Sequence, residues 1–366
     1  MSFPAFLIIK TSAIGDIIQT FPVLEYLRRK FPSAKIDWVV EKGSRDLLEA
    51  HPELNRLYCI NTKQWRKNLF SKKTHREFNQ FRKELRSVNY DAVFDLQGNS
   101  KSGLVTLLAR SRDKVGFARD CVPEWPNLLA TRTRLSVPNG GGIRERYLAF
   151  VQRYFQDQDP FFPSGVALKL PGEEKNKLQE LCLSPVLQRR PRFMVAFGSK
   201  WPNKQLYLPT LESWVQEIER NLKCSFIFIF GDMDEKLIAE RLAAKFPANA
   251  QAVGHLSLPL WQALMYQVDA VIAMDSAALH LCGTTTTPSF SVFGPSTASF
   301  YKPSHAGHYA LQAACPYGRT FEKRCSLLRT CPTGACLKEL SPNVLAESFF
   351  NWFNQAKGIS CSAISS

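Results

Sequence analysis

Strand and helix signals alternate along both halves of this 366-residue chain. Short apolar runs predict strands at 6–10, 35–40, 56–60, 92–95 and 114–117, and again at 192–196, 224–230, 270–274 and 289–293. Helical patterns lie between them, in the second half at 208–221, 234–246, 258–267 and 277–282, with a last helix at 343–356. Such alternation predicts parallel sheets with helices on both faces, and therefore an α/β fold.

The first predicted helix carries an apolar stripe formed by Ile14, Ile17, Ile18, Phe21 and Leu24. Pro22 falls inside this stripe. A proline within a helix removes a backbone hydrogen bond and crowds the preceding turn, so we expect either a kink or a tight first turn here.

The length of the chain favours two domains of ordinary size. Residues 160–171 contain three prolines and several turn-forming residues, which indicates a linker. We therefore expect one domain at 1–165, a second at 172–340, and a C-terminal helix and tail at 341–366.

The net charge of +15 is unevenly distributed. Up to Pro160 there are 27 basic and 17 acidic residues, and after it 20 and 15. The densest run, residues 63–86, holds nine Lys or Arg against Glu77 and Glu84. Such a field attracts a polyanion: nucleic acid, a phosphorylated glycolipid or an anionic membrane. A solvated helix face is the simpler explanation, and the spacing does not decide between the two.

Membrane and redox signals favour the cytosol. No apolar run approaches the roughly 18 residues of a membrane span, and no basic segment precedes the short apolar N-terminus as in a secretory signal. The ten cysteines include a late cluster without any C-x-x-C pair, so a zinc site is disfavoured. The cysteines of this cluster are Cys315, Cys325, Cys331 and Cys336. We interpret them as reduced thiols, and a disulfide or a metal site stays open.

Several nucleotide-binding and metal-binding motifs are absent from the sequence. There is no G-x-x-x-x-G-K-[ST] loop, no G-x-G-x-x-G after a strand, no H-E-x-x-H and no paired C-x-x-C. Gly140 to Gly142 follow Pro138 and Asn139 and indicate a turn. Kinases, dehydrogenases and zinc hydrolases are therefore disfavoured.

Chemically active side chains follow several predicted strands. Asp16 lies just beyond the first strand, and Asp275 and Ser276 follow the strand at 270–274. Open α/β sheets bind ligands at that edge, and a helix start near Ser276 can bind an anion. In the same half, Lys204 could neutralise a diphosphate, and Glu235 could accept from ribose hydroxyls.

Each of these residues also has a simpler structural explanation. Asp16 and Asp275 could be helix-start acids that stabilise the dipole, and Lys204 could be an ordinary surface lysine. His280 lies one turn beyond Ser276 and could be a packed histidine. The functional interpretation is strengthened because all of them fall on the same predicted sheet edges.

Four motifs resemble glycosyltransferase family 9, the bacterial heptosyltransferases. Residues 10–22 resemble its K-T-S-x-x-G-D-x-x-x-T-x-P start, and 95–102 its D-x-Q-G-x-x-K-S. Residues 200–204 resemble its second-domain lysine loop, and 275–280 with 293–296 its D-[ST]-G-x-x-H and F-G-P signatures. The chain departs from the family at Ala277, where relatives carry glycine. The likeness covers most of the chain in the same order.

The resemblance implies two facing Rossmann-like domains with an interdomain cleft, the GT-B fold, the first binding the acceptor and the second the nucleotide sugar. It implies inverting transfer of heptose from ADP-heptose to the inner core of lipopolysaccharide, either Kdo-lipid A or a heptosylated core. It implies no metal, no cofactor and no nucleic acid, and a cytoplasmic enzyme peripheral to the anionic inner face of the inner membrane. The implied catalytic residues are Asp16, as general base, and Lys204. The implied donor-binding residues are Ser199, Lys200, Glu235, Leu256, Asp275, Ser276, Ala277 and His280. The implied acceptor-binding residues are Ser12, Gly15, Lys63, Arg66, Lys67, Lys72, Lys73, Gln97 and Lys101.

Two other functions stay open from the sequence. The basic charge would suit a nucleic-acid-binding protein, although no helix-turn-helix, RNP or zinc-finger signature is present. A related transferase that uses another nucleotide sugar would keep the same fold.

Overall fold

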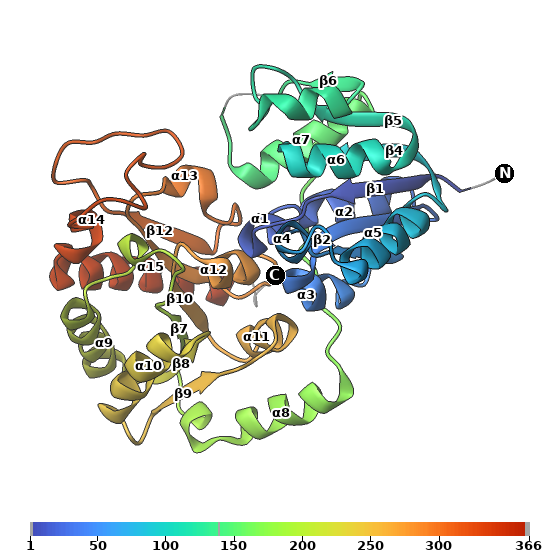
Figure 1. Ribbon diagram of the computed structural model, residues 1–366. Helices are drawn as coiled ribbons and strands as arrows, with labels where there is room; N and C mark the ends of the chain where they lie inside the picture. Colours follow the sequence, from blue (N-terminus) through green and yellow to red (C-terminus); the bar gives the residue numbers. More distant parts are fainter. Residues whose placement is uncertain (1–2, 138–139, 363–366) are drawn as a thin grey trace. The chain divides into compact units, whose positions relative to one another are not determined.

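The computed structural model describes residues 3–137 and 140–362, except for the side chains of 357–362 (Figure 1). The chain divides into two compact units, residues 1–169 and 170–366. The segment at 160–171 has no regular secondary structure, and part of it packs on unit 1. There the Ser164 hydroxyl and N–H donate to Glu25, and Phe161 lies against Tyr26 and Arg29.

Unit 1 contains a six-stranded parallel sheet of order β3-β2-β1-β4-β5-β6. The strand β1 is buried along its whole length and pairs with β2 and β4, as expected for the centre of a parallel sheet. The strands are β1 (Ala5–Ile9), β2 (Lys35–Glu41), β3 (Arg56–Ile60), β4 (Asn89–Asp95), β5 (Arg110–Phe117) and β6 (Thr133–Leu135).

The helices of unit 1 connect these strands. The first apolar stripe is divided between two helices, and Pro22 lies in the first turn of the second, where its missing N–H costs no hydrogen bond. The tight first turn is thus observed, and a continuous kinked helix is not. The helices are α1 (Ile14–Ile18), α2 (Phe21–Lys30), α3 (Arg45–Glu49), α4 (Thr62–Lys67), α5 (Lys72–Leu85), α6 (Ser100–Leu108) and α7 (Ile143–Tyr154), with 3₁₀ helices η1 (Lys42–Ser44) and η2 (Trp125–Ala130).

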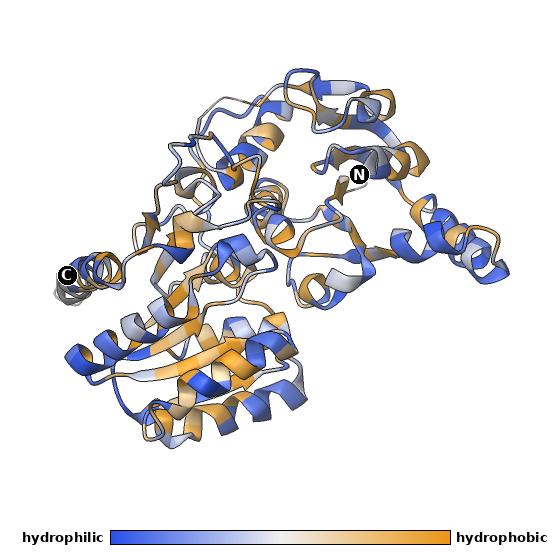
Figure 2. Ribbon diagram, turned by 60° about the vertical axis from the view of Figure 1, so that its left-hand side comes forward, coloured by the Kyte–Doolittle hydropathy of each residue, from blue (hydrophilic) through white to orange (hydrophobic). Residues whose placement is uncertain are grey.

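Unit 2 contains a second six-stranded parallel sheet, of order β12-β11-β10-β7-β8-β9. Counted from its own first strand, this is the same order as in unit 1. Figure 2 shows apolar strands covered by helices with hydrophilic outer faces. The strands are β7 (Arg192–Ala196), β8 (Ser225–Phe230), β9 (Ala250–Gly254), β10 (Ala270–Met274), β11 (Ser289–Phe293) and β12 (His308–Gln312).

The last helix, α15, belongs to the core of unit 2. Its Phe349 is fully buried and packs edge-on against Phe193 of β7 and Trp214 of α9. The helices of unit 2 are α8 (Gly172–Leu183), α9 (Leu208–Leu222), α10 (Met233–Ala244), α11 (Leu258–Met265), α12 (Ala277–Cys282), α13 (Ala298–Tyr301), α14 (Ala335–Lys338) and α15 (Pro342–Ser362), with η3 (Pro185–Gln188) and η4 (Pro202–Lys204).

All nine expected strands are present, and three further strands were not predicted. The missed strands β6, β9 and β12 all lie at sheet edges. An edge strand needs no continuous apolar run, because one of its sides is not covered by a neighbouring strand. The sequences TRL, AQAVG and HYALQ therefore carried too weak a signal.

The shared strand order identifies the ligand-binding edge of each sheet. The order reverses between β1 and β4 in unit 1, and between β7 and β10 in unit 2. In open α/β sheets, ligands bind beyond the carboxyl ends of the strands at this reversal. The segments that directly follow these four strands contain Asp16, Gln97, Lys204 and Asp275.

Candidate functional site

Asp275 is the centre of a polar cluster at the switch point of unit 2, the place where the strand order reverses between β7 and β10. It directly follows β10 and is only 5% exposed. The Lys204 ammonium lies 2.5 Å from its Oδ2, and the Ser296 hydroxyl donates to the same oxygen. His280 Nε2 lies 3.5 Å from its Oδ1. Three loops and one helix thus meet at one buried carboxylate.

The charge state of Asp275 follows from these partners. Burial alone would raise the pKa of its carboxyl, but the hydrogen bond from His280 and the charge of Lys204 hold this pKa well below its usual value. The ionised carboxylate therefore fixes the position of the lysine ammonium at the sheet edge.

The loop that carries Lys204 is held by backbone and side-chain hydrogen bonds. The N–H of Lys204 donates to Trp201 O at 2.8 Å, within η4. The Gln205 amide donates to Ser199 O at 2.7 Å, and the Ser199 hydroxyl donates to Asp275 O at 3.3 Å. Lys200 is exposed on this loop. The lysine is therefore mounted on a braced turn.

The start of α12 lies beside the same cluster. Ser276 is its N-cap residue and Ala277 its first helical residue. The Ser276 hydroxyl oxygen is buried and has no hydrogen-bond partner among the described residues. A buried hydroxyl without a partner is costly, and a helix start favours an anion. Both features suit an anionic group placed here.

A carboxylate lies beyond the end of β8. The Gly231 N–H donates to Glu235 Oε2 at 2.7 Å, and Asp232 caps the start of α10 through the Glu235 N–H. The Glu235 carboxylate lies so close to Gly198 that an added Cβ there would meet its Oε1 at 1.9 Å. Burial raises the pKa of Glu235, and the Gly231 hydrogen bond opposes the shift. Leu256 is half-buried in the loop after β9.

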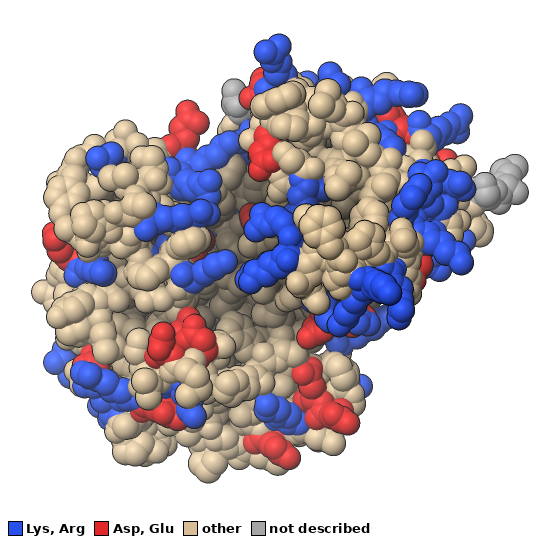
Figure 3. Space-filling model, in the orientation of Figure 1, with Lys and Arg blue, Asp and Glu red and all other residues tan. Residues whose placement is uncertain are grey.

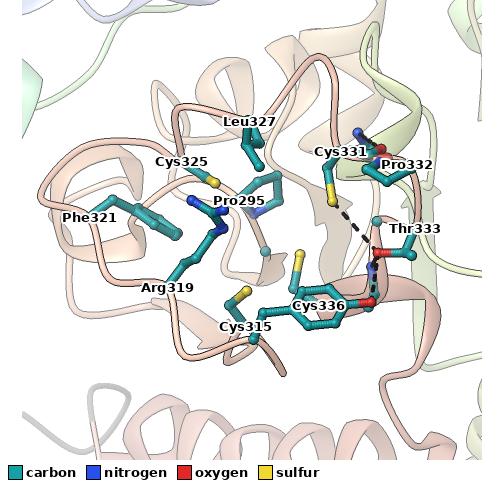
Figure 4. Close-up of a pocket in the computed structure, with 15 residues that line it drawn as sticks. Pro295, Cys315, Arg319, Phe321, Cys325, Leu327, Cys331, Pro332, Thr333 and Cys336 are labelled. Carbon is teal, nitrogen blue, oxygen red and sulfur yellow. Dashed lines mark hydrogen bonds between the residues drawn. The ribbon is translucent and has the colours of Figure 1, made fainter.

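The late cysteines surround a cavity of about 270 Å³ next to the Lys204 loop. Figure 4 shows the side chains of Cys315, Cys325, Cys331 and Cys336 around it. None of the nine cysteines with described side chains forms a disulfide, and no three described His, Cys, Asp or Glu side chains are grouped as a metal ion would need. The Asn203 amide donates to the backbone oxygens of Leu328 and Cys331, both at 3.0 Å, so the loop braces η4.

The switch point of unit 1 carries Asp16. This residue is half-buried at the third position of α1, and its Oδ2 accepts from the Ala13 N–H at 3.1 Å. Gln97, beyond β4, accepts from the N–H groups of Thr11 and Ser12 at 3.0 and 3.2 Å. Gln97 therefore fixes the loop that leads into Asp16, and Gly15 lies within α1 itself.

A buried lysine lies behind this loop. Lys10 is 3% exposed, and its ammonium donates to Leu96 O at 3.0 Å and to the Tyr147 hydroxyl at 2.6 Å. Burial lowers the pKa of Lys10, while the charges of Asp16 and then Asp95 oppose this shift. Lys10 therefore ties the loop after β4 to α7 behind the Asp16 loop.

The basic run forms a helical hairpin, α4 and α5, whose linking loop exposes apolar residues. Leu69 and Phe70 are 58% and 96% exposed. The Trp65 indole donates to Glu77 at 2.9 Å and fastens α4 to α5. In Figure 3, Lys and Arg side chains gather over this part of unit 1. Five predicted acceptor-binding cations are exposed here and form no ion pair within the described residues: Lys63, Arg66, Lys67, Lys72 and Lys73.

Lys101 differs from these five cations. Its ammonium pairs with Glu41 at 2.8 Å, and the same carboxylate accepts from the Thr62 hydroxyl and N–H. Its charge is therefore partly compensated, and the pair links the start of α6 to the start of α4.

Comparison with known proteins identifies the family. Residues 78–330, well over half of the chain, match the model of glycosyltransferase family 9 (heptosyltransferase). This chain is a member of that family. The resemblance noted from the motifs is confirmed, and the protein is a glycosyltransferase.

Two kinds of relative support this assignment. Over 326 residues, covering 87% of each chain, this family 9 glycosyltransferase is 28% identical to lipopolysaccharide heptosyltransferase 1 of Pseudomonas aeruginosa. Its fold is similar to that of the Escherichia coli heptosyltransferase WaaC solved with ADP, with a TM-score of 0.77, 22% identity, and coverage of 95% of this chain and 99% of that one. For the same enzyme solved with ADP-2-deoxy-2-fluoro heptose, the TM-score is 0.75 at 22% identity, with coverage of 96% of this chain and 99% of that one. The expected fold of Rossmann-like units is confirmed.

Sequence reasoning found separate residues of this family 9 glycosyltransferase but missed several contacts. Ser296 was part of a recognised motif, and its place just after a buried strand could have indicated its contact with Asp275. Asn203 and Gln205, which brace the Lys204 loop, carried no distinctive signal. The Lys10–Tyr147 pair joins residues 137 positions apart, which no local pattern can predict.

Proposed function

We propose that this protein is an inverting heptosyltransferase that moves heptose from ADP-heptose to the inner core of lipopolysaccharide. The observation that carries the proposal is the cluster at the carboxyl end of β10, where Lys204, Ser296 and His280 converge on Asp275. Its chemistry suits a sugar held by a diphosphate leaving group. The donor is inferred from the family and from the relative solved with an ADP-heptose analogue.

The donor would be held at the switch point of unit 2. The Lys204 ammonium would neutralise charge as it develops on the departing diphosphate, and the Ser276 hydroxyl at the start of α12 would donate to a phosphate oxygen. Ser199, Lys200, Ala277 and His280 would line the same part of the site. Because Asp275 already fixes the ammonium, little reorganisation would be needed during the reaction.

The nucleoside would lie beyond β8 and β9. Glu235 would accept from the ribose hydroxyls, as an acid after a strand does in many nucleotide sites, and Leu256 would contact the base. The contact between Glu235 and Gly198 leaves no space for a side chain at position 198. A glycine is therefore needed where the carboxylate approaches the β7 loop.

Asp16 would be the general base. It would take the proton from the acceptor hydroxyl as that oxygen bonds to the anomeric carbon and the bond from this carbon to the diphosphate breaks, releasing ADP. A carboxylate is a weak base toward a sugar hydroxyl, but the proton can be transferred late, as oxocarbenium character draws the nucleophile in. The position of the carboxylate then matters more than its basicity.

The acceptor would be recognised by unit 1. The five unpaired cations of the α4–α5 hairpin suit the phosphates and Kdo carboxylates of the lipopolysaccharide inner core, with Ser12, Gly15, Gln97 and Lys101 near the reacting hydroxyl. A lipid-anchored acceptor would bring the enzyme to the anionic inner face of the inner membrane. No described helix is both long and apolar enough to span a bilayer.

A donor and acceptor matrix tests the proposal. Purified protein is incubated with ADP-heptose, ADP-glucose or UDP-glucose, and with Kdo-lipid A or a heptosylated core, and the product is identified by mass spectrometry. We expect a product one heptose heavier, formed from ADP-heptose alone. Efficient transfer from UDP-glucose would identify another nucleotide-sugar transferase. Binding to duplex DNA that exceeds binding to either acceptor would favour a nucleic-acid-binding protein.

A further inference from the structure

Unit 1 exposes an apolar surface outside the proposed substrate sites. Leu104 and Leu107 of α6 are 55% and 51% exposed, and Trp125 and Leu129 of η2 are 69% and 74% exposed. Leucines three positions apart share one face of a helix. We call these four side chains the α6–η2 face.

The two elements of this face are rigidly joined. Gly103 allows the close approach, since an added Cβ there would lie 3.2 Å from the Asn127 amide and 3.3 Å from Ala130. The Asn127 amide donates to Asp95 at 2.6 Å and to Asn99 O at 3.0 Å. The exposed side chains are therefore presented together by a fixed support.

Cations border the face, and two of them touch its backbone. The Lys114 ammonium donates to Leu107 O at 2.9 Å, and the Arg134 guanidinium donates to Leu128 O at 2.8 Å. Arg110 and Arg112 are exposed on β5, alternate with the half-buried Ser111 and Asp113, and lie on the same side of the strand as Lys114. Figure 3 shows a largely uncharged surface over α6, bordered by Lys and Arg side chains over β5 and β6.

The acids nearby, Asp113 and Glu124, form no ion pair with these cations among the described residues. Asp113 accepts from the Thr133 hydroxyl, and Glu124 accepts from the N–H and hydroxyl of Ser100. Burial lowers the pKa of Lys114, and the charges of Arg86 and Arg132 lower it further. The cations thus repel one another, and an anionic surface would relieve that repulsion.

We propose that the α6–η2 face is a docking surface for an anionic phospholipid bilayer, with Trp125, Leu129, Leu104 and Leu107 entering the interface and the β5 and β6 cations contacting lipid phosphates. A Trp and leucines ringed by Arg and Lys match the layered chemistry of a bilayer surface, apolar below and anionic above. A protein partner would need acidic residues placed opposite these cations and an apolar surface shaped to fit these four side chains. No feature of the α6–η2 face favours such a partner over a bilayer. The inference deepens the proposed function, which places the acceptor in a membrane.

Vesicle binding tests the surface directly. Leu107→Glu/Leu129→Glu is compared with the parent protein in co-sedimentation with phosphatidylcholine vesicles, with and without phosphatidylglycerol. Leu183→Glu, at a 78% exposed leucine on α8 of unit 2, is the matched control. We expect the double variant to bind anionic vesicles about tenfold more weakly or worse, because it removes apolar area and adds negative charge. The control should bind like the parent.

A second measurement locates the contact. Lipids brominated on the acyl chain should quench tryptophan fluorescence of the parent, and this quenching should fall in Trp125→Phe. Heptose transfer to a deacylated, water-soluble acceptor should be unchanged in the double variant, while transfer to vesicle-embedded acceptor should fall. If the parent protein transfers heptose to neither acceptor, the proposed function is wrong. The vesicle-binding comparison does not depend on transfer and still tests the docking surface. Equal vesicle binding by parent and double variant, or a dimeric parent that the double substitution makes monomeric, would overturn the proposal.

Discussion

The pairing of Lys204 with Asp275 is the residue-scale feature on which donor binding would depend. Lys204→Met should weaken ADP binding at least about tenfold, because a charge-assisted hydrogen bond to phosphate is worth about 1.5–3 kcal/mol. Isothermal titration with ADP measures this loss. Lys177→Met, at an exposed lysine of α8, is the control and should bind ADP like the parent.

The same variant leaves the buried Asp275 carboxylate without its main counter-charge. Breaking a buried pair costs about 3–5 kcal/mol, so Lys204→Met should also lower the free energy of unfolding. Adding Asp275→Asn should recover part of that stability without recovering ADP affinity. If the double variant regained the affinity of the parent, Lys204 would not contact the diphosphate.

At the scale of residues, the sequence could predict chemistry but not contacts. The position of Lys204 after a strand was visible, but its partner lies 71 residues away. Local patterns report neither which loops meet at a sheet edge nor which polar atoms remain unpartnered there. The unsatisfied Ser276 hydroxyl is therefore a finding of the structure alone.

At the scale of elements, the α4–α5 hairpin is the clearest functional candidate. Neutralising Lys63, Arg66 and Lys67 together to Gln should raise KM for a phosphorylated acceptor at least about tenfold, since each cation contributes about 1 kcal/mol near an anionic surface. The kcat at saturating acceptor and the affinity for ADP should stay the same.

Salt provides the check on this prediction. The acceptor KM of the parent should rise with ionic strength more steeply than that of the triple variant, because screening acts on charges the variant lacks. Lys175→Gln/Lys177→Gln on α8 is the control. An unchanged acceptor KM in the triple variant would show that the run is only a solvated helix face.

Element prediction succeeded where burial imposes a strong pattern. Strands β7, β10 and β11 were predicted to the residue, because these inner strands are mostly apolar and buried along nearly their whole length. The strand β12 was missed, because an edge strand such as HYALQ mixes exposed and buried positions. The first helix was read as one stripe because α1 and α2 share an apolar face on both sides of Pro22.

At the scale of the whole molecule, both sheets have the same strand order, and Asp16, Gln97, Lys204 and Asp275 follow the four strands at its reversal. Alternation of strands and helices predicted the α/β class. The strand order depends on which distant strands pair, and local sequence patterns do not show this. The family match then joins this fold to an enzyme class.

A buried histidine makes the stability of the molecule sensitive to mild acid. Burial, and then the charge of Lys169, lower the pKa of His51 to about 3. The unfolded chain takes up a proton near pH 6.5, whereas the folded chain resists it, so stability falls as pH drops through this interval. Between pH 7 and 5 this group should cost about 2 kcal/mol.

Chemical unfolding at the two pH values measures this effect. His51→Leu should flatten the pH dependence of the unfolding free energy by that amount, whatever its effect at pH 7. His255→Leu, at an exposed histidine, should keep the slope of the parent. A His51→Leu variant as acid-sensitive as the parent would contradict the assignment.

The central claim is that one carboxylate of unit 1 removes the proton of an acceptor while unit 2 holds the nucleotide sugar. The most direct test is Asp16→Asn, assayed for ADP-heptose binding by titration and for heptose transfer in a single turnover. We predict donor affinity and unfolding midpoint like those of the parent, with most of the transfer rate lost, because the amide fills the same space but cannot accept the proton. A transfer rate within about threefold of the parent would contradict the account, since general base catalysis typically contributes about 10²-fold or more.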